Sequence, residues 1–216
     1  ILGYILLPFV YTFTQSLTTE TGYGFDVFKE FFSNKNHLVT VKNTILMGVL
    51  SVLTCGTIGI SLAMYMTFLA GKWKKFIHIL LLSPMMIPGV IIVIAFIQLY
   101  GESGIITKAI QYALGLANAP LQFQGLDAII FVITFTQYVY FYLNIYVALK
   151  YVDYSTIEAA RSMGASWFKV FKDVIWPVIM PAVLTSTIVT FASGASAFSA
   201  PNLIGGGFKV LSTQIV

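Results

Sequence analysis

Three long runs without a charged residue constrain the fold of this chain more than any other feature. The runs cover 44–71, 76–101 and 128–149, and none of them contains Asp, Glu, Lys or Arg. A helix of about 20 apolar residues crosses the hydrocarbon core of a bilayer, so each run is long enough to span it. Only 9% of the residues are charged and 58% are hydrophobic, whereas about 25% of the residues of soluble domains are charged. The sequence therefore predicts an integral membrane protein.

The apolar runs are continuous, which favours helices over a barrel, because barrel strands alternate apolar and polar residues over about 10 positions. We expect an all-α integral membrane protein, a polytopic bundle of about six transmembrane helices. The expected helices cover 1–18, 43–70, 76–100, 127–149, the Pro- and Gly-interrupted region 174–208, and a stretch that begins near Val210. A short amphipathic piece, "IITKAIQYALG", is expected within the loop 101–126. Residues 1–216 are expected to form a single transmembrane domain, trimmed at both ends.

The distribution of basic residues predicts which loops face the cytoplasm, because Lys and Arg are enriched in short cytoplasmic loops. Two connectors on one side carry seven of them, namely Lys72, Lys74, Lys75, Lys150, Arg161, Lys169 and Lys172. Three longer loops on the other side carry five, namely Lys29, Lys35, Lys42, Lys108 and Lys209. The connector 150–173 is therefore expected on the cytoplasmic side.

The predicted spans lack the ionisable residues with which an ion-driven carrier binds its driving ion inside the membrane. No Asp, Glu, Lys or Arg falls near the centre of a predicted span. The Gly-rich stretch "GGGFKVLS" at 205–212 does not have the Gly-x-x-x-x-Gly-Lys-Ser/Thr spacing of a phosphate-binding loop, and a tight turn is expected there. We therefore expect that the chain does not hydrolyse ATP and that its energy comes from a partner that docks from the cytoplasm.

The sequence also lacks the residue patterns on which intramembrane enzymes depend. Its spans contain no paired carboxylates, no His-x-x-x-His metal site and no Gly-x-Ser-x-Gly turn. The one cysteine, Cys55, lies inside an apolar run, where it offers neither a disulfide framework nor metal-ligand spacing. We therefore expect no catalytic residue, no bound metal and no cofactor.

The cytoplasmic connector is polar and predicts a bent helical elbow on the membrane surface. The pair Ser155–Thr156 can cap a helix, and Glu158 follows Ser155 at the spacing of a capping box. A short helix is then expected over 157–163. Gly164 is expected to end it, and Ser166 to start a second helical piece.

The second piece of the elbow carries aromatic residues on one side and charged residues on the other. Trp167, Phe168 and Phe171 are expected to bury an aromatic edge against the bundle or a partner, while Lys169, Lys172 and Asp173 stay in water. An interfacial helix that rests on lipid is the alternative, since amphipathic character does not distinguish lipid from a protein groove.

The stretch from Glu158 to Pro177 resembles the EAA signature of inner-membrane permease subunits of binding-protein-dependent ABC importers. That pattern is Glu-Ala-Ala, three residues, Gly, nine residues, Ile, any residue, Leu-Pro. The positions that match in register are Glu158, Ala159, Ala160, Gly164 and Pro177, whereas Val174 replaces the usual Ile and Trp176 replaces Leu. The segments "VKNTILMGVLSVLTCGTIGISLAMYM" and "LLLSPMMIPGVIIVIAF" also look like family helices, the second with Pro84 and Pro88 as kinks.

The resemblance implies the fold of a type I ABC importer permease. In that family two permease subunits form the solute pathway, each docks on a cytoplasmic ABC ATPase, and an extracellular solute-binding protein delivers the solute. The second permease would be an identical copy, a related subunit or a fused second half. The implied location is the cytoplasmic (inner) membrane of a bacterium, with lipid around the chain and no nucleic acid among its partners.

The resemblance also assigns an ATPase-coupling loop at 150–177. Its coupling residues are Glu158, Ala159, Ala160, Ser162, Met163, Gly164, Ala165 and Pro177. Glu158 would pair with a basic residue of the ATPase, and Gly164 would permit the sharp change of chain direction. A short, rigid connector would transmit closure of the ATPase dimer to the membrane helices.

Polar residues inside the predicted spans are the candidates for the lining of a solute pathway. They are Ser83, Gln98, Gln137, Tyr138, Asn144, Thr187 and Ser196. Each has an alternative interpretation as an interhelical hydrogen bond worth about 1 kcal/mol. The tail 191–215 looks more like the iron(III), thiamine, polyamine and aminophosphonate branch of the family than like the sugar branch. Ferric iron or another small charged solute is therefore the expected cargo.

Two other function classes remain open at this point. The first is an ion-driven secondary carrier or channel whose elbow rests on lipid, and the second is an intramembrane enzyme. The register of the signature and the uncharged membrane interior favour an importer permease over both.

Overall fold

The computed structural model describes residues 2–19 and 22–214 and is almost entirely helical. Its elements are α1 (Leu2–Ser16), β1 (Thr18–Thr19), β2 (Gly22–Tyr23), α2 (Asp26–Ser33), α3 (Lys35–Phe68), α4 (Lys74–Leu82), η1 (Ser83–Met86), α5 (Gly89–Tyr100), α6 (Ile105–Leu114), α7 (Leu126–Ala148), η2 (Leu149–Tyr151), α8 (Tyr154–Ser162), α9 (Trp167–Val170), η3 (Phe171–Ile175), α10 (Trp176–Ala195), α11 (Ser199–Ile204) and α12 (Leu211–Gln214). The expected all-α membrane fold is confirmed.

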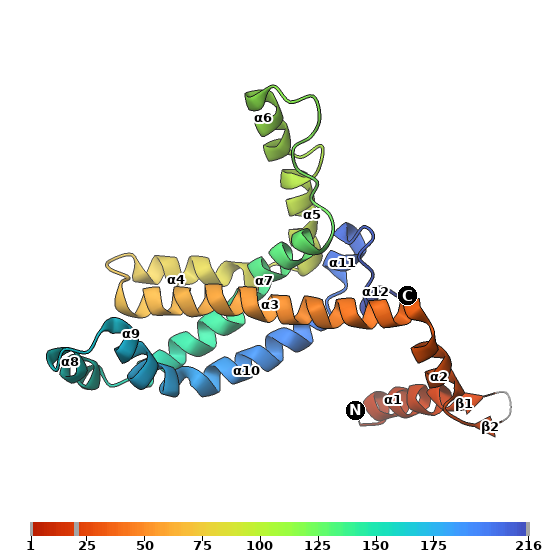
Figure 1. The fold of residues 1–216 in the computed structure, drawn as a ribbon, viewed down its shortest axis with the longest axis horizontal. Coiled ribbons are helices and arrows are strands. Elements are labelled where there is room, and N and C mark those ends of the chain that lie inside the picture. Colours follow the sequence, from red (N-terminus) through yellow and green to blue (C-terminus); the bar gives the residue numbers. More distant parts are fainter. Residues whose placement is uncertain (1, 20–21, 215–216) are drawn as a thin grey trace.

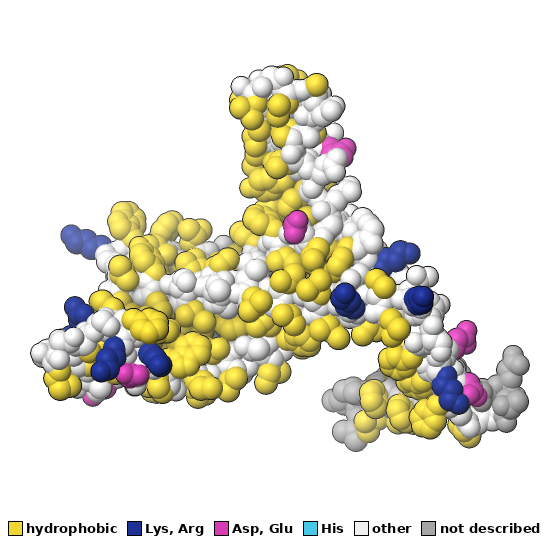
Figure 2. Space-filling view, in the orientation of Figure 1, with side chains coloured by type: hydrophobic (Ala, Val, Ile, Leu, Met, Phe, Trp, Pro, Cys, Tyr) yellow, Lys and Arg dark blue, Asp and Glu magenta, His cyan; other side chains and the backbone are white. Residues whose placement is uncertain are grey.

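The helices α3, α7 and α10 pack against one another and form the body of the molecule, and α4 is bonded to α7 (Figure 1). One end of this bundle, here called the elbow end, carries α8, α9 and the turn before α4; the opposite end, here called the far end, carries α11 and the start of α3 (Figure 1). In Figure 2 the flank of the bundle is mainly hydrophobic, and basic side chains lie at its two ends. That distribution is the one expected for helices that cross a bilayer.

Four helical stretches of the described residues are long and apolar enough to cross a membrane, rather than about six. They are Lys35–Phe68, Gly89–Leu114, Leu126–Tyr151 and Trp167–Ala195. The expected first and last spans correspond to α1, with 15 residues, and α12, with 4 residues. The helix count from sequence is therefore approximate, whereas the helical class is correct.

The helix α3 begins at Lys35, eight residues before the expected start at 43. Asn34 caps it, because its side-chain oxygen accepts a hydrogen bond from the Asn36 backbone N–H at 2.9 Å. The expected loop 19–42 also contains β2 and α2, which join α1 to the far end of α3. The polar first turns of α3 hid this extension, since hydrophobic periodicity starts only inside the membrane.

The expected helix 76–100 is broken in its middle into α4, η1 and α5. Pro84 and Pro88 cause the break, because a proline removes a backbone N–H and disfavours helical geometry in the preceding residue. Figure 1 shows α5 leaving the bundle at the break and forming, with α6, an arm that stands away from it. The expected proline kinks and the amphipathic helix before residue 115 are both present.

The first segment of this broken helix, α4, is bonded to α7 by two hydrogen bonds that involve side chains. The hydroxyl of Tyr138 donates a hydrogen bond to the Leu81 carbonyl at 2.8 Å. Tyr142 and His78 share another, at 2.5 Å between Oη and Nδ1. These bonds satisfy polar groups that would otherwise be buried without partners, so α4 and α7 form one unit at the elbow end.

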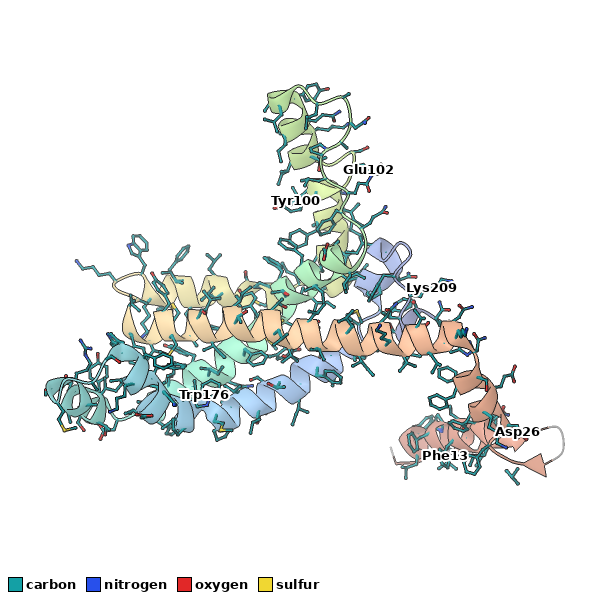
Figure 3. The ribbon with its side chains drawn as sticks, viewed as in Figure 1. Phe13, Asp26, Tyr100, Glu102, Trp176 and Lys209 are labelled. Carbon is teal, nitrogen blue, oxygen red and sulfur yellow. The ribbon has the colours of Figure 1, made fainter. Side chains whose placement is uncertain are left out.

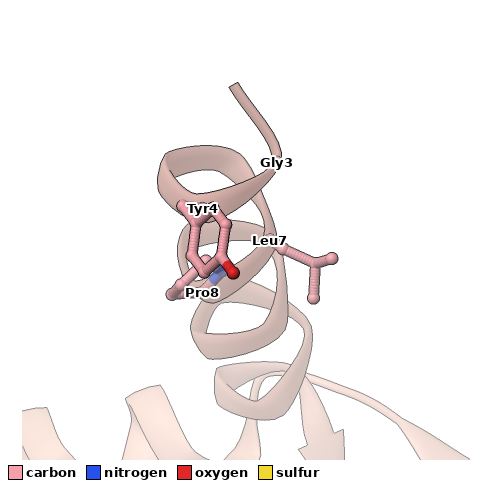
Figure 4. Close-up of a pocket in the computed structure, with 4 residues that line it drawn as sticks. All are labelled: Gly3, Tyr4, Leu7 and Pro8. Carbon is pink, nitrogen blue, oxygen red and sulfur yellow. The ribbon is translucent and has the colours of Figure 1, made fainter. Parts of the chain in front are cut away.

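The helix α1 lies apart from the bundle in Figure 1. A shallow hollow of about 540 Å³ on this helix is formed by Gly3, Tyr4, Leu7 and Pro8 (Figure 4). All four residues come from two turns of one exposed helix, and the walls are almost wholly apolar. A functional pocket combines apolar walls with convergent polar groups, so this hollow is an uncovered apolar helix face and not a candidate site.

Candidate functional site

The first helix of the elbow, α8, begins at Tyr154 and not at the expected residue 157. Asp153 is its N-cap: the carboxylate accepts a hydrogen bond from the Ser155 backbone N–H at 2.9 Å. The predicted cap at Ser155–Thr156, with its capping box to Glu158, is therefore wrong. Asp153 competes better for the position because a carboxylate at the positive end of the helix dipole adds electrostatic stabilisation.

Gly164 ends α8 as expected, and the structure shows how. Its φ is +84°, in the left-handed region that glycine adopts without a steric penalty. The Gly164 N–H donates to the Arg161 carbonyl and the Ala165 N–H to the Ala160 carbonyl, both at 3.0 Å. This pair of bonds is a Schellman motif, which satisfies the last carbonyls of a helix and reverses the chain.

The second piece of the elbow also begins where expected. Ser166 is the N-cap of α9, and its hydroxyl accepts a hydrogen bond from the Lys169 backbone N–H at 3.4 Å. A single turn of α-helix passes into the π-helical turn Phe171–Ile175 and then into α10 without a loop. The elbow is therefore continuous with a membrane helix.

The expected aromatic edge is only partly present: of its three residues, Phe171 is half-buried and packs against the core at the elbow end. Phe168 is 77% exposed and Trp167 is 47% exposed, whereas Val170 and Ile175 are buried in the core at the elbow end. The π-helical turn shifts the helical phase, which brings the two aliphatic residues inward. The expectation that the charged residues Lys169, Lys172 and Asp173 stay in water is confirmed.

The side chains of α8 divide between the bundle and the solvent. Ile157 is 4% exposed and packs in the core at the elbow end, with Ala160 against it. The predicted coupling residues on the opposite side are exposed, namely Glu158, Ala159, Ser162 and Met163. Gly164 and Pro177 are also exposed, and Ala165 is half-buried. The elbow therefore presents a continuous accessible face at one end of the bundle.

Aromatic contacts fix the elbow to the end of α3. The ring of Phe68, in the last turn of α3, lies 6.3 Å from that of Tyr154 and 6.0 Å from that of Trp167. Arg161 lies over the Trp167 ring at 5.7 Å and donates a hydrogen bond to the Ala165 carbonyl at 3.2 Å. These contacts join α8 and α9 to the end of α3, and α9 continues through the π-helical turn into α10.

A groove of about 590 Å³ lies in the bend of the elbow. Its walls come from the end of α8, from α9 and from the π-helical turn, and they include Met163, Gly164, Lys169 and Asp173. The groove combines an apolar floor with one basic and one acidic side chain, so its chemistry suits a protein partner.

A second, smaller cavity of about 150 Å³ opens between the start of α5, α7 and the α10–α11 junction. Gln137 lines it, together with three polar residues that the sequence analysis did not select: Thr136, Ser193 and Ser199. The Oε1 atom of Gln137 is buried and has no hydrogen-bond partner among the described residues. The Thr136 hydroxyl donates to the carbonyl oxygens of Val132 and Ile133 in its own helix, at 3.1 and 3.0 Å.

The structure brings only Gln137, of the seven predicted pathway residues, into this cavity. Tyr138 is buried against α4, and Asn144 donates a hydrogen bond to Ser186 at 2.9 Å. Thr187 faces a separate apolar groove between α3 and α10. The remaining three, Ser83, Gln98 and Ser196, are exposed, and Ser83 and Ser196 each donate a hydrogen bond to a carbonyl of the preceding turn.

Comparison with known proteins gives one family and a consistent set of relatives. The sequence model of the family described as "Binding-protein-dependent transport system inner membrane component" matches residues 56–216. A probable ABC transporter permease protein of Sinorhizobium fredii is 30% identical in an alignment of 219 positions, which covers all of this chain and 38% of that protein. The spermidine/putrescine transport system permease protein of Haemophilus influenzae is 23% identical, over 99% of this chain and 77% of its own length.

A putative ferric transport system permease protein of Haemophilus influenzae is 28% identical over 73% of this chain, and the match covers 25% of that protein. The chain thus spans well under half of two of these three relatives. Among solved structures, a bacterial ABC transporter involved in the import of the acidic polysaccharide alginate superposes with a TM-score of 0.80 at 18% identity, over 99% of this chain and 78% of that one. At that identity the superposition establishes the fold alone.

Proposed function

The chain belongs to the family of binding-protein-dependent transport system inner membrane components, and we propose that it is the permease subunit of an ABC importer in a bacterial cytoplasmic membrane. In this role it forms part of a solute pathway and couples uptake to ATP hydrolysis by a separate cytoplasmic ATPase. A second permease subunit completes the pathway, and an extracellular binding protein delivers the solute. The elbow end faces the cytoplasm in this proposal, and the far end faces outwards.

The observation that carries this proposal is the accessible elbow fixed to two membrane helices. Its exposed residues form a face for the ATPase, while Ile157 anchors the other side of α8 in the core. Because α9 continues into α10 without a loop and Phe68 joins α8 to α3, closure of the ATPase dimer moves whole helices and is not absorbed by a flexible connection. In this proposal ATP hydrolysis belongs to the separate ATPase.

The helices moved by the elbow also form the proposed solute pathway. The packing of α10 against α7 and α3 extends from the elbow to the cavity at Gln137. A buried polar atom without a hydrogen-bond partner destabilises the fold, and the Gln137 Oε1 atom is such an atom. We propose that a polar solute in transit supplies its missing partner. We place the solute at this cavity during transport. The small charged solutes named for the relatives, polyamines and ferric iron, are the proposed cargo classes.

Gln137→Leu is expected to slow solute uptake about tenfold. The substitution keeps the approximate size of the side chain and removes the amide oxygen, and a hydrogen bond to a charged solute group is worth about 1.5–3 kcal/mol. Uptake into proteoliposomes measures the effect. Gln98→Leu, on the exposed side of α5, is the matched control and should leave uptake unchanged. Equal rates for the two variants would remove Gln137 from the pathway.

Glu158→Lys is expected to reduce the stimulation of ATP hydrolysis by the binding protein at least tenfold. The Glu158 side chain is exposed and makes no ion pair within 2–19 and 22–214, so the bundle should fold normally. In the proposed complex its carboxylate meets a basic residue of the ATPase, and charge reversal replaces that attraction by repulsion. The same exchange at Glu102, on the arm side (Figure 3), should have no effect on hydrolysis.

The function itself is tested by copurification and reconstitution of the wild-type chain with the ATPase and binding protein. We expect ATP hydrolysis to rise when the binding protein carries its solute, and uptake of putrescine, ferric ion or 2-aminoethylphosphonate to require ATP. Failure of any ATPase to copurify, together with uptake driven by an ion gradient, would instead identify an ion-driven carrier.

A further inference from the structure

A polar cleft of about 360 Å³ opens at the far end of the bundle, away from both the elbow and the Gln137 cavity. It lies where the first turns of α3 meet the Gly-rich turn before α12. Its lining includes Asn34, Asn36, His37, Asn43, Lys209 and Gln214. Figure 3 shows Lys209 at this end of the bundle, beside α11 and the outer turns of α3.

Two hydrogen bonds join the turn at 209–211 to α3, beside the cleft. The side-chain amide of Asn43 donates a hydrogen bond to the Lys209 carbonyl at 2.9 Å, and the Leu211 N–H donates one to the Thr44 hydroxyl at 2.9 Å. Val210, between them, is fully buried. The turn that carries Lys209 is therefore fixed on α3, and the cleft between them has stable walls.

The charge of the cleft favours a negative ligand group. Lys209 is exposed and is the one charged residue among the described residues that line the cleft, while side-chain amides from Asn36, Asn43 and Gln214 can donate hydrogen bonds. The N-terminus of the 34-residue helix α3 also lies in its wall and adds the positive end of a helix dipole. The neighbouring helix α2 carries two acidic residues, Asp26 and Glu30, and neither lines the cleft. Asp26 pairs with Lys29 at 3.5 Å.

One further polar atom in the wall lacks a partner. The ring of His37 stacks on that of Phe31 at 4.7 Å, and its Nδ1 atom is buried without a hydrogen bond to any described residue. The stacking fixes the imidazole beside the cleft, and its Nδ1 atom is a hydrogen-bonding group that the described residues do not use.

From this geometry we infer that the cleft is a docking socket for a carboxylate side chain of the extracellular solute-binding protein. The inference rests on the proposed function, which supplies the partner and the outward orientation of the far end. A volume of about 360 Å³ is too small for a folded element and large enough for a protruding side chain. Lys209 forms the ion pair, and the surrounding amides donate hydrogen bonds to the carboxylate oxygens.

The test is the concentration of binding protein that gives half-maximal stimulation of ATP hydrolysis in the reconstituted complex. Lys209→Glu should raise this concentration at least tenfold, Lys209→Arg should leave it near the wild-type value, and high salt should weaken the wild-type response. Lys108→Glu, on exposed α6 and outside the cleft, is the matched control. An acidic-to-Lys scan of the binding-protein surface should yield one variant that restores docking to Lys209→Glu.

The outcomes separate the inference from the proposed function. A complex whose wild-type form shows no stimulation contradicts both. If Lys209→Glu leaves the stimulation unchanged, or if Lys108→Glu weakens it equally, the socket is overturned. Either result leaves the proposed importer function standing. Lowered uptake with unchanged docking would assign the cleft to an anionic solute, which also overturns the inference.

Discussion

Gly164→Pro is expected to abolish solute uptake by the assembled importer while the helical bundle remains folded. The native φ of +84° is inaccessible to proline, whose ring fixes φ near −65°. Proline also removes the N–H that Gly164 donates to the Arg161 carbonyl. No atom lies within 4 Å of a Cβ placed at this position, so the damage is confined to the direction of the chain between α8 and α9.

The matched control is Gly115→Pro. Gly115 ends α6 in the same left-handed conformation, with φ +61°, and a Cβ there also meets nothing within 4 Å. Both substitutions break a glycine cap of a short helix, but Gly115 lies on the arm and Gly164 on the elbow. Uptake and binding-protein-stimulated ATP hydrolysis in proteoliposomes are the measurements, with circular dichroism to confirm folding. Normal coupling in Gly164→Pro would show that the elbow does not transmit the motion.

The elbow was the part of the site most predictable from sequence, because its signals are local. Glycine at 164 and serine at 166 define a helix end and a helix start through their own backbone chemistry, and both predictions are confirmed. The start of α8 was wrong because Asp153, Ser155 and Thr156 are all good caps, and the choice among them depends on geometry. The π-helical turn after α9 has no sequence signature, so the buried aliphatic face was missed.

The cavity at Gln137 was less predictable, since its residues come from distant parts of the sequence. Small polar residues in membrane helices look alike whether they line a cavity or bond to their own backbone. Gln137 and Ser196 were both predicted to line the pathway because each is a polar residue in an apolar span. Only Gln137 lines the cavity, together with Ser193 and Ser199. Composition and apolar runs identified the membrane class, whereas the break at Pro88 and the crossing of α3 and α7 decide which residues meet.

The crossing of α3 and α7 gives the second large expected effect: Gly59→Ala should destabilise the bundle by about 1–3 kcal/mol, the usual cost of overpacking. A Cβ at Gly59 would lie 2.5 Å from the Phe141 Cβ and 2.9 Å from both the Tyr138 carbonyl oxygen and the Tyr142 nitrogen. Two of these three atoms are backbone, so no rotation of a side chain relieves the contact. The helices must separate, and the buried residues around Tyr142 lose packing.

Gly56→Ala is the matched control, since Gly56 lies on the same helix one turn away. The nearest atoms to its added Cβ would belong to the Phe141 ring, at 3.4 Å or more, and alanine is favoured over glycine inside a helix by about 1 kcal/mol. The two variants should therefore have opposite effects on the midpoint of thermal unfolding in detergent. Because α3 and α7 carry both the elbow contact at Phe68 and the cavity at Gln137, Gly59→Ala should also lower uptake. Equal unfolding midpoints would mean that α3 and α7 do not pack through this crossing.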